Sequence, residues 1–198
     1  MTVTTEAAGP RHAPGLVALF QRTESPCFCR WWHFEGDKNA WLDRCANRPE
    51  ESRAELERAL IEGNGQARGM VALGDADQVI GWMKLTPASS VPKLFEQRLY
   101  KGLPCLNGPR DGVWVVGCFL IDEAWRRQGV AGALLDAGIA EAQCAGAKRL
   151  EAFPRRADDV PAEGLWTGPF ELYRARGFEV VHELAQYPVL RLSLEPGA

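Results

Sequence analysis

Within Val113–Gly138, a nine-residue apolar run is followed directly by a basic turn with a glycine and then by an Ala- and Leu-rich segment. From Val113 to Ile121 the residues are apolar on both alternating faces, a pattern typical of a strand that is covered on both sides. After the turn, apolar residues recur at helical spacing, at Val130, Leu134, Leu135, Ile139 and Ala142. The stretch therefore predicts a central strand, a turn and a helix of an α/β fold.

The turn itself has the chemistry of an anion site. Arg126, Arg127 and Gln128 precede Gly129, and a helix that starts here exposes unpaired backbone N–H groups. The helix dipole and the two guanidinium groups favour a phosphate at that end. No GxxxxGK[ST] pattern is present, and residues 129–132 do not fill GxGxxG. Both nucleotide-binding interpretations are thereby weakened, and a phosphate site of another kind remains.

Size and charge exclude several classes of protein. A chain of 198 residues forms one domain of ordinary size, residues 1–198, and buries roughly 70% of its unfolded surface. The net charge is −3, from 23 basic and 26 acidic residues, and no Lys/Arg run exceeds a pair. This composition argues against a nucleic-acid or membrane-surface partner. No export signal or spanning segment of ~20 apolar residues is visible, so we expect a cytoplasmic protein.

The remainder of the chain alternates helical and strand-like patterns without an internal repeat. Helices are expected at 13–22, from Asp37 or Asn39 to Cys45, at 49–62, at 91–100 and at 170–176. Strands are expected at 68–73 and 78–86, joined as a hairpin, and then at 149–153, 178–183 and 187–194. Residues 101–112 and 155–168 read as loops.

Two motifs in order resemble a known family. Arg126-x-x-Gly129-x-Ala131 after an apolar strand resembles the pyrophosphate-binding motif of the GNAT superfamily of N-acetyltransferases, and LYRARGF at 172–178 resembles its LYxxxGF ending. The resemblance covers about Arg68 to Leu194. It implies an α/β (α+β) fold with a mixed, mostly antiparallel sheet flanked by helices. The cofactor would lie in a cleft between splayed central strands.

Three further segments resemble a little-characterised bacterial subgroup of that superfamily: CFCRWW near the N-terminus, VWVVGCFLI before the turn, and LEAFP in the next strand. One feature departs from the family pattern. Many relatives carry an Asn before the LYxxxGF helix, and the comparable place here is near Trp166, within LWTGPF. The resemblance therefore leaves a side-chain amide contact to the cofactor in doubt.

The cofactor that the resemblance implies is acetyl-CoA, bound as a co-substrate. Its pyrophosphate would contact the amides of residues 128–132, and its pantetheine arm would lie along the strand end as an added strand does. The implied contact residues are Phe119, Leu120, Ile121, Arg126, Arg127, Gln128, Gly129, Val130, Ala131 and Gly132.

The same resemblance implies direct transfer to an amine. A backbone N–H near Phe119 would polarise the acetyl carbonyl, an amine would attack it, and Tyr173 would protonate the leaving thiolate. The alternative for Tyr173 is a ring packed in the core. Glu151 is the first candidate for the general base, although an ion pair with Arg149 or Arg155 explains it equally well. Weaker candidates for the base are Glu35, His33 and Asp111.

The cysteines are expected to be free thiols, because nothing in the sequence indicates export. Cys27, Cys29, His33 and Cys45 offer four zinc ligands, but C-x-C-x3-H is not a usual zinc spacing, and no metal is expected. Cys118 sits within an apolar run and reads as a buried, inert thiol. Trp31 and Trp32 are candidates for the wall of an acceptor site.

The function expected from these features is acetyl transfer from acetyl-CoA to a small-molecule amine or a protein amino group. The alternative is a catalytically silent acetyl-CoA-binding regulatory module of the same fold. Strands at 178–183 and 187–194, if they lie at a sheet edge, offer a route to a homodimer.

Overall fold

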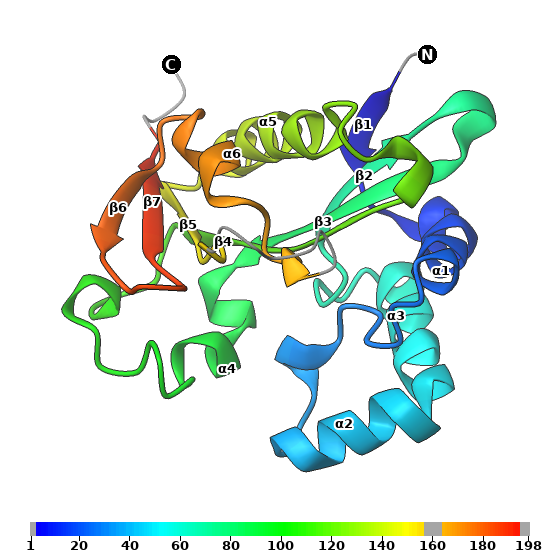
Figure 1. Ribbon diagram of the computed structural model, residues 1–198, viewed down its shortest axis with the longest axis horizontal. Helices are drawn as coiled ribbons and strands as arrows, with labels where there is room; N and C mark the ends of the chain where they lie inside the picture. Colours follow the sequence, from blue (N-terminus) through cyan, green and yellow to red (C-terminus); the bar gives the residue numbers. More distant parts are fainter. Residues whose placement is uncertain (1–2, 157–163, 195–198) are drawn as a thin grey trace.

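The computed structural model describes residues 3–156 and 164–194, which build one seven-stranded sheet covered by helices on both faces (Figure 1). The strand order is β1-β2-β3-β4-β5-β7-β6, and among these only β4 and β5 run parallel. The strands are β1 (Thr4–Ala7), β2 (Gly69–Leu73), β3 (Val79–Pro87), β4 (Val113–Ile121), β5 (Arg149–Ala152), β6 (Glu179–His182) and β7 (Val189–Ser193). A mixed, mostly antiparallel sheet was expected, and it is confirmed.

Helices divide between the two faces of the sheet. In Figure 1, α5 and α6 lie above the sheet, and α1 to α4 lie on the opposite side. The helices are α1 (Ala13–Arg22), α2 (Lys38–Asn47), α3 (Pro49–Glu62), α4 (Pro92–Phe95), α5 (Val130–Cys144) and α6 (Phe170–Arg174). The first face carries the LYRARGF segment and the basic turn, and the second carries the N-terminal third of the chain.

Local sequence explains most helix boundaries. Asp37 caps α2 by accepting a hydrogen bond from the amide of Ala40 at 2.9 Å. Pro49 opens α3, and Gly63 ends it with φ +62°. Helix α5 buries Val130 and Leu134, among others, against β2 and β3. The helices predicted around these signals are therefore confirmed.

Two predictions about the sheet and its flanks are wrong. The helix expected at 91–100 is reduced to α4, because the chain turns at Gln97, whose carbonyl accepts bonds from the amides of Tyr100 and Lys101 at 2.8 Å. Strand β7 is not at an edge, since it pairs with both β5 and β6. Of β6 and β7, only β6 is an edge strand, because β7 lies between β5 and β6 and pairs antiparallel with both.

All six cysteines are free, as expected. None of the helices within residues 3–156 and 164–194 is both long and apolar enough to cross a bilayer.

Candidate active site

The central strand β4 loses one of its two neighbours halfway along its length. Its parallel pairing with β5 runs from Val113 to Val116, opposite Arg149 to Ala152, whereas its pairing with β3 continues to Ile121. In the register with β3, Lys84 faces two residues of β4, Gly117 and Cys118, which form a bulge. Beyond Val116 the β5-facing edge of β4 therefore has no strand partner among the described residues.

The turn after β4 presents free backbone donors. Arg127 has φ +60° and Gly129 has φ +82°, a conformation that glycine adopts at little cost. Helix α5 follows at once, no described side chain caps its start, and the first amide with a helical acceptor is that of Ala133, at 3.0 Å from the carbonyl of Gly129. The amides of residues 130–132 therefore remain available to a ligand.

Charged side chains surround this helix start. The guanidinium of Arg126 is half-buried and lies 3.4 Å from the carbonyl of Ile121. Arg127 is exposed, and Gln128 donates to the carbonyl of Ala124 at 2.7 Å. Sequence reasoning missed Arg176, whose guanidinium lies above Gly132, where an added Cβ would come within 2.6 Å of it. A third guanidinium therefore lies beside the turn, in addition to those of Arg126 and Arg127.

Arg176 is held in place by an ion pair with Asp136. Its Nε and Nη2 atoms donate to the two carboxylate oxygens at 2.5 and 3.0 Å. This bidentate pair connects the LYRARGF segment to α5. The LYRARGF motif therefore contributes to the surroundings of the basic turn, because it positions a guanidinium beside the start of α5.

Tyr173 lies on α6, fully buried against the end of β4. Its ring meets the rings of Phe119 and Phe178 edge-on, at centroid distances of 6.3 and 5.2 Å. Burial and the nearby Cys118 raise the pKa of Tyr173 well above its usual value, so the hydroxyl keeps its proton at neutral pH. Tyr173, the predicted general acid, therefore lies against β4, the strand predicted to carry the cofactor.

The segment from Leu165 to Gly168 fills the open edge of β4. The amide of Phe119 donates to the carbonyl of Trp166 at 2.6 Å, and the Tyr173 hydroxyl donates to the carbonyl of Thr167 at 2.7 Å. The sequence left a side-chain amide contact at this place in doubt, and here backbone carbonyls contact the two groups. The donors expected to serve acetyl-CoA are thus occupied by the protein itself.

Glu151 lies on β5, buried in an ion-pair cluster. Its Oε1 atom is 2.6 Å from Nη2 of Arg191 and 3.3 Å from Nε of Arg149. Arg191 also donates to the carbonyl of Cys105 at 2.6 Å. The carboxylate is fully buried and does not line the cavity described next. This arrangement favours the ion-pair interpretation of Glu151 over that of a general base.

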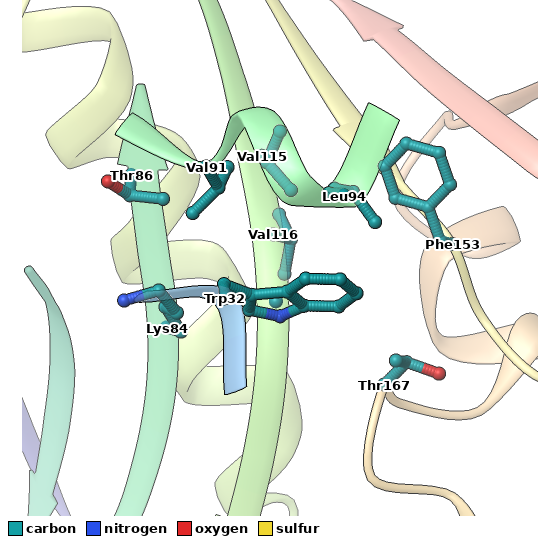
Figure 2. A pocket seen from close by; sticks show the side chains of 10 residues that line it. Trp32, Lys84, Thr86, Val91, Leu94, Val115, Val116, Phe153 and Thr167 are labelled. Carbon is teal, nitrogen blue, oxygen red and sulfur yellow. The ribbon is translucent and has the colours of Figure 1, made fainter. Parts of the chain in front are cut away.

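A small cavity lies under the bulge of β4, on the face opposite α5 (Figure 2). The room inside is about 20 Å³, enough for a water molecule. Its walls are apolar and aromatic apart from one cation and two hydroxyls, and they comprise Trp32, Lys84, Thr86, Val91, Leu94, Val115, Val116, Gly117, Phe153 and Thr167. Of the two tryptophans proposed for an acceptor site, Trp32 is therefore placed in the cavity wall.

Lys84 is the ionisable residue of that wall, and it was missed from the sequence. Its ammonium donates to the carbonyl of Gln66 at 2.9 Å and is fully buried. Burial lowers the pKa of Lys84. In Figure 2 the ammonium points away from the Trp32 ring. A lone lysine inside the apolar run 79–87 was the signal available in the sequence.

The weaker base candidates are not assembled at the cavity. Glu35 and Asp111 are exposed. Burial, together with Lys84 and Arg30, lowers the pKa of His33 to about 3, which makes the imidazole a poor base at neutral pH. Within residues 3–156 and 164–194, no cluster of His, Cys, Asp or Glu is arranged to hold a metal.

Comparison with known proteins identifies a family and solved structures of similar fold. Residues 24–170 match the sequence model of the Acetyltransferase (GNAT) family. A comparison with curated proteins finds no match. Among solved structures, the chain is similar to PaiA N-acetyltransferase from Thermoplasma acidophilum in complex with coenzyme A, with a TM-score of 0.58 and 10% identity, over 98% of this chain and 100% of that one.

Two further solved structures share the fold. A GNAT family acetyltransferase from Brucella melitensis in complex with acetyl-CoA has a TM-score of 0.53 and 17% identity, over 100% of this chain and 91% of that one. YhbS from Escherichia coli in complex with CoA has a TM-score of 0.53 and 20% identity, over 96% and 82%. The expected fold is confirmed.

Proposed function

The chain belongs to the acetyltransferase (GNAT) family, and we propose that it transfers the acetyl group of acetyl-CoA to a primary amine by direct attack in a ternary complex. One observation carries this proposal: the open edge of β4, the uncapped start of α5 and the buried Tyr173 converge on one place. In this proposal the whole chain serves as one acetyltransferase domain, working in the cytoplasm.

The cofactor would bind along β4 and α5. We assign its pyrophosphate to the amides of residues 130–132, with Arg126, Arg127, Gln128 and Gly129 around it, because free helix-start amides and arginines together favour a polyanion. The pantetheine arm would pair with the edge of β4 at residues 119–121. The PaiA and Brucella proteins of the same fold were solved with CoA and acetyl-CoA, which supports this assignment.

Binding requires a displacement. The carbonyls of Trp166 and Thr167 hold the amide of Phe119 and the hydroxyl of Tyr173. When the pantetheine arm replaces that segment, both donors become free for the thioester. The amide then stabilises the developing oxyanion, and the hydroxyl protonates the departing CoA sulfur as the C–S bond breaks.

The acceptor would approach from the cavity under the bulge. An ammonium group is disfavoured there, because the walls are apolar and Lys84 is already positive. We therefore propose that the amine reacts in its neutral form and that no dedicated carboxylate base is needed, because the proton that the nitrogen loses as the amide forms returns to the Tyr173 oxygen, which has given its own proton to the CoA sulfur. The acceptor is a small-molecule amine or a protein amino group, and Trp32 and Thr167 must move apart to admit it, since the free space is only about 20 Å³.

A silent acetyl-CoA-binding module is the second candidate function. The observation that favours it is the occupation of both predicted catalytic donors by residues 166 and 167. A homodimer formed through the edge strand β6 is compatible with either function, and light scattering of the purified chain tests it.

One experiment separates the two functions. The purified chain is mixed with acetyl-CoA and a library of small amines and amino-terminal peptides, and release of free CoA thiol is followed. Turnover with an acceptor and none without it supports the enzyme. If acetyl-CoA raises the unfolding temperature of the chain but no library member gives turnover, the silent module is supported. If acetyl-CoA does not raise the unfolding temperature, both functions are rejected.

A further inference from the structure

Lys93 lies where two walls of the small cavity meet. In Figure 2, Trp32 lies on one side of the cavity, and Val91 and Leu94 lie on the other. Trp32 belongs to segment 31–36, which has one short turn of 3₁₀ helix. Lys93 is on the short helix α4, between Val91 and Leu94 in sequence. Its side chain is therefore placed to connect α4 to the segment that supplies Trp32.

The ammonium of Lys93 binds that segment through backbone carbonyls and ring faces. It donates hydrogen bonds to the carbonyls of Phe34 at 2.8 Å and Gly36 at 3.1 Å. It also lies 3.7 Å from the centroid of the Trp31 ring and 5.3 Å from that of the Phe34 ring, within the range of cation–π attraction. Among the residues that the structure describes, no other hydrogen bond joins segment 31–36 to α4.

Segment 31–36 depends on such contacts for its position. Phe28 and Cys29, shortly before it, have φ +42° and +56°, a conformation that is unfavourable for residues other than glycine. On the α2 side, the Trp31 ring packs on the Trp41 ring at a centroid distance of 5.5 Å. The contact with α4 therefore decides how closely the segment approaches the cavity.

A second support of Trp32 belongs to the segment that acetyl-CoA is proposed to displace. The ring centroids of Trp32 and Trp166 are 6.5 Å apart, and Trp166 is 42% exposed. The carbonyl of Trp166 accepts the hydrogen bond from the amide of Phe119, so the ring contact would be disturbed when the pantetheine arm takes that place. Lys93 would then still tie the Trp32 segment to α4.

We propose that Lys93 is a specificity-determining residue, which holds Trp32 against the acceptor cavity and so limits the size of the amine that enters. This inference rests on the proposed function, which places the acceptor in that cavity. The free space of about 20 Å³ suits a water molecule and not an organic amine. Every acceptor must therefore separate Trp32 from the α4 side, and a bulkier amine disrupts more of the Lys93 contacts.

A shift in the population of open molecules gives the size of the effect. The apparent dissociation constant of an acceptor is its intrinsic value divided by the fraction of molecules whose cavity is open. The Lys93 ammonium is half-buried, and loss of its hydrogen bonds and ring contacts should raise that fraction about fivefold. Lys93→Met removes the ammonium and keeps an unbranched apolar side chain, so it should tighten the binding of a bulky amine by the same factor.

The test titrates benzylamine, a bulky amine, into the full-length chain at mildly alkaline pH and follows tryptophan fluorescence. Lys93→Met should bind benzylamine about fivefold more tightly than the wild-type protein. Lys93→Arg keeps a cation over the Trp31 ring and should bind it like the wild-type protein. Lys101→Met removes the same charge from an exposed lysine near α4 and should also leave the affinity unchanged. In the ligand-free proteins, amide hydrogen exchange of residues 31–36 should be faster in Lys93→Met alone.

Equal benzylamine affinity in the wild-type and Lys93→Met proteins, or an equal gain in Lys101→Met, would overturn the proposal. Absence of turnover across the amine library, with tighter benzylamine binding and faster exchange in Lys93→Met, would reject acetyl transfer and support the role of Lys93 at the cavity. If the wild-type protein turns over, Lys93→Met should lower KM more for bulky acceptors than for small ones. An unchanged ratio of kcat/KM between bulky and small acceptors would reject this inference and leave the proposed function standing.

Discussion

The two sides of the candidate active site are built in opposite ways. The proposed cofactor side is almost continuous in sequence, since residues 119–132 run from the edge of β4 through the turn into α5. The proposed acceptor side takes its residues from separate segments, among them Trp32, Lys84, Leu94, Phe153 and Thr167. A site built from consecutive residues can be inferred from local spacing in the sequence. A site whose residues come from separate segments depends on how the chain packs.

The two sides also differ in their electrostatics. The proposed cofactor side presents exposed donors, namely helix-start amides and arginines such as Arg127, which suit a ligand that carries several negative charges. The acceptor side buries one cation, Lys84, within apolar walls. The first arrangement attracts a polyanion from water, and the second favours an uncharged reactant. The predictions below test that contrast.

Replacing Tyr173 with Phe should have the largest effect. We expect the transfer rate to fall by about 100-fold with acetyl-CoA affinity unchanged, because the change removes a proton donor and keeps the packing of the ring. Steady-state release of thiol and a separate binding titration measure the two quantities. An unchanged transfer rate would mean that Tyr173 is not the proton donor to the CoA sulfur.

Glu151→Gln tests whether this carboxylate acts as a general base for the acceptor or only as a structural ion-pair partner. Loss of its charge beside Arg191 and Arg149 should lower the free energy of unfolding by about 2 kcal/mol, with the pH profile of transfer unchanged. Glu179→Gln is the control, because Glu179 is exposed and also stands opposite Arg191, on β6. A large rate loss in a fully stable Glu151→Gln protein would instead identify a base.

Arg127→Ala should weaken acetyl-CoA binding by about tenfold, and the loss should shrink at high salt because the contact is exposed. Arg58→Ala, a change at an exposed arginine of α3, serves as the control for net charge. Calorimetric titrations at two salt concentrations measure both variants. Equal losses in the two variants would mean that only the overall charge matters.

His33, which lies near Lys84 and Arg30, provides a pH-dependent effect on stability rather than on transfer. Its folded pKa of about 3 lies below the ordinary value of 6.5, so the unfolded chain binds the proton more strongly between those values. The free energy of unfolding should therefore decrease as the pH falls from about 6.5 to about 3, by at most about 1.4 kcal/mol per pH unit. Denaturation of His33→Gln should show a shallower decrease, and identical slopes would contradict the assignment.

Local patterns predicted much of the fold and one side of the site. The apolar run of β4, the cap at Asp37 and the glycine at 63 are local signals, and the elements that they mark are present. The insertion of β7 between β5 and β6 could not be inferred, because strand order depends on long-range pairing. Lys84 and Arg176 were missed for the same reason, since their roles depend on residues far away in the chain.

The central claim is that the turn before α5 binds the pyrophosphate of acetyl-CoA, and one matched pair of variants tests it directly. Gly129 and Gly63 both have positive φ, +82° and +62°, and an added Cβ meets nothing within 4 Å at either position. Alanine should therefore cost each about 1 kcal/mol of stability.

The measurement is thermal unfolding of the wild-type, Gly129→Ala and Gly63→Ala proteins across an acetyl-CoA titration. Acetyl-CoA at 100 times its Kd should stabilise the wild-type and Gly63→Ala proteins by about 2.7 kcal/mol. Gly129→Ala should lose most of that gain, because the backbone at the phosphate site is distorted. Equal stabilisation of both variants, or none in the wild-type protein, would contradict the claim.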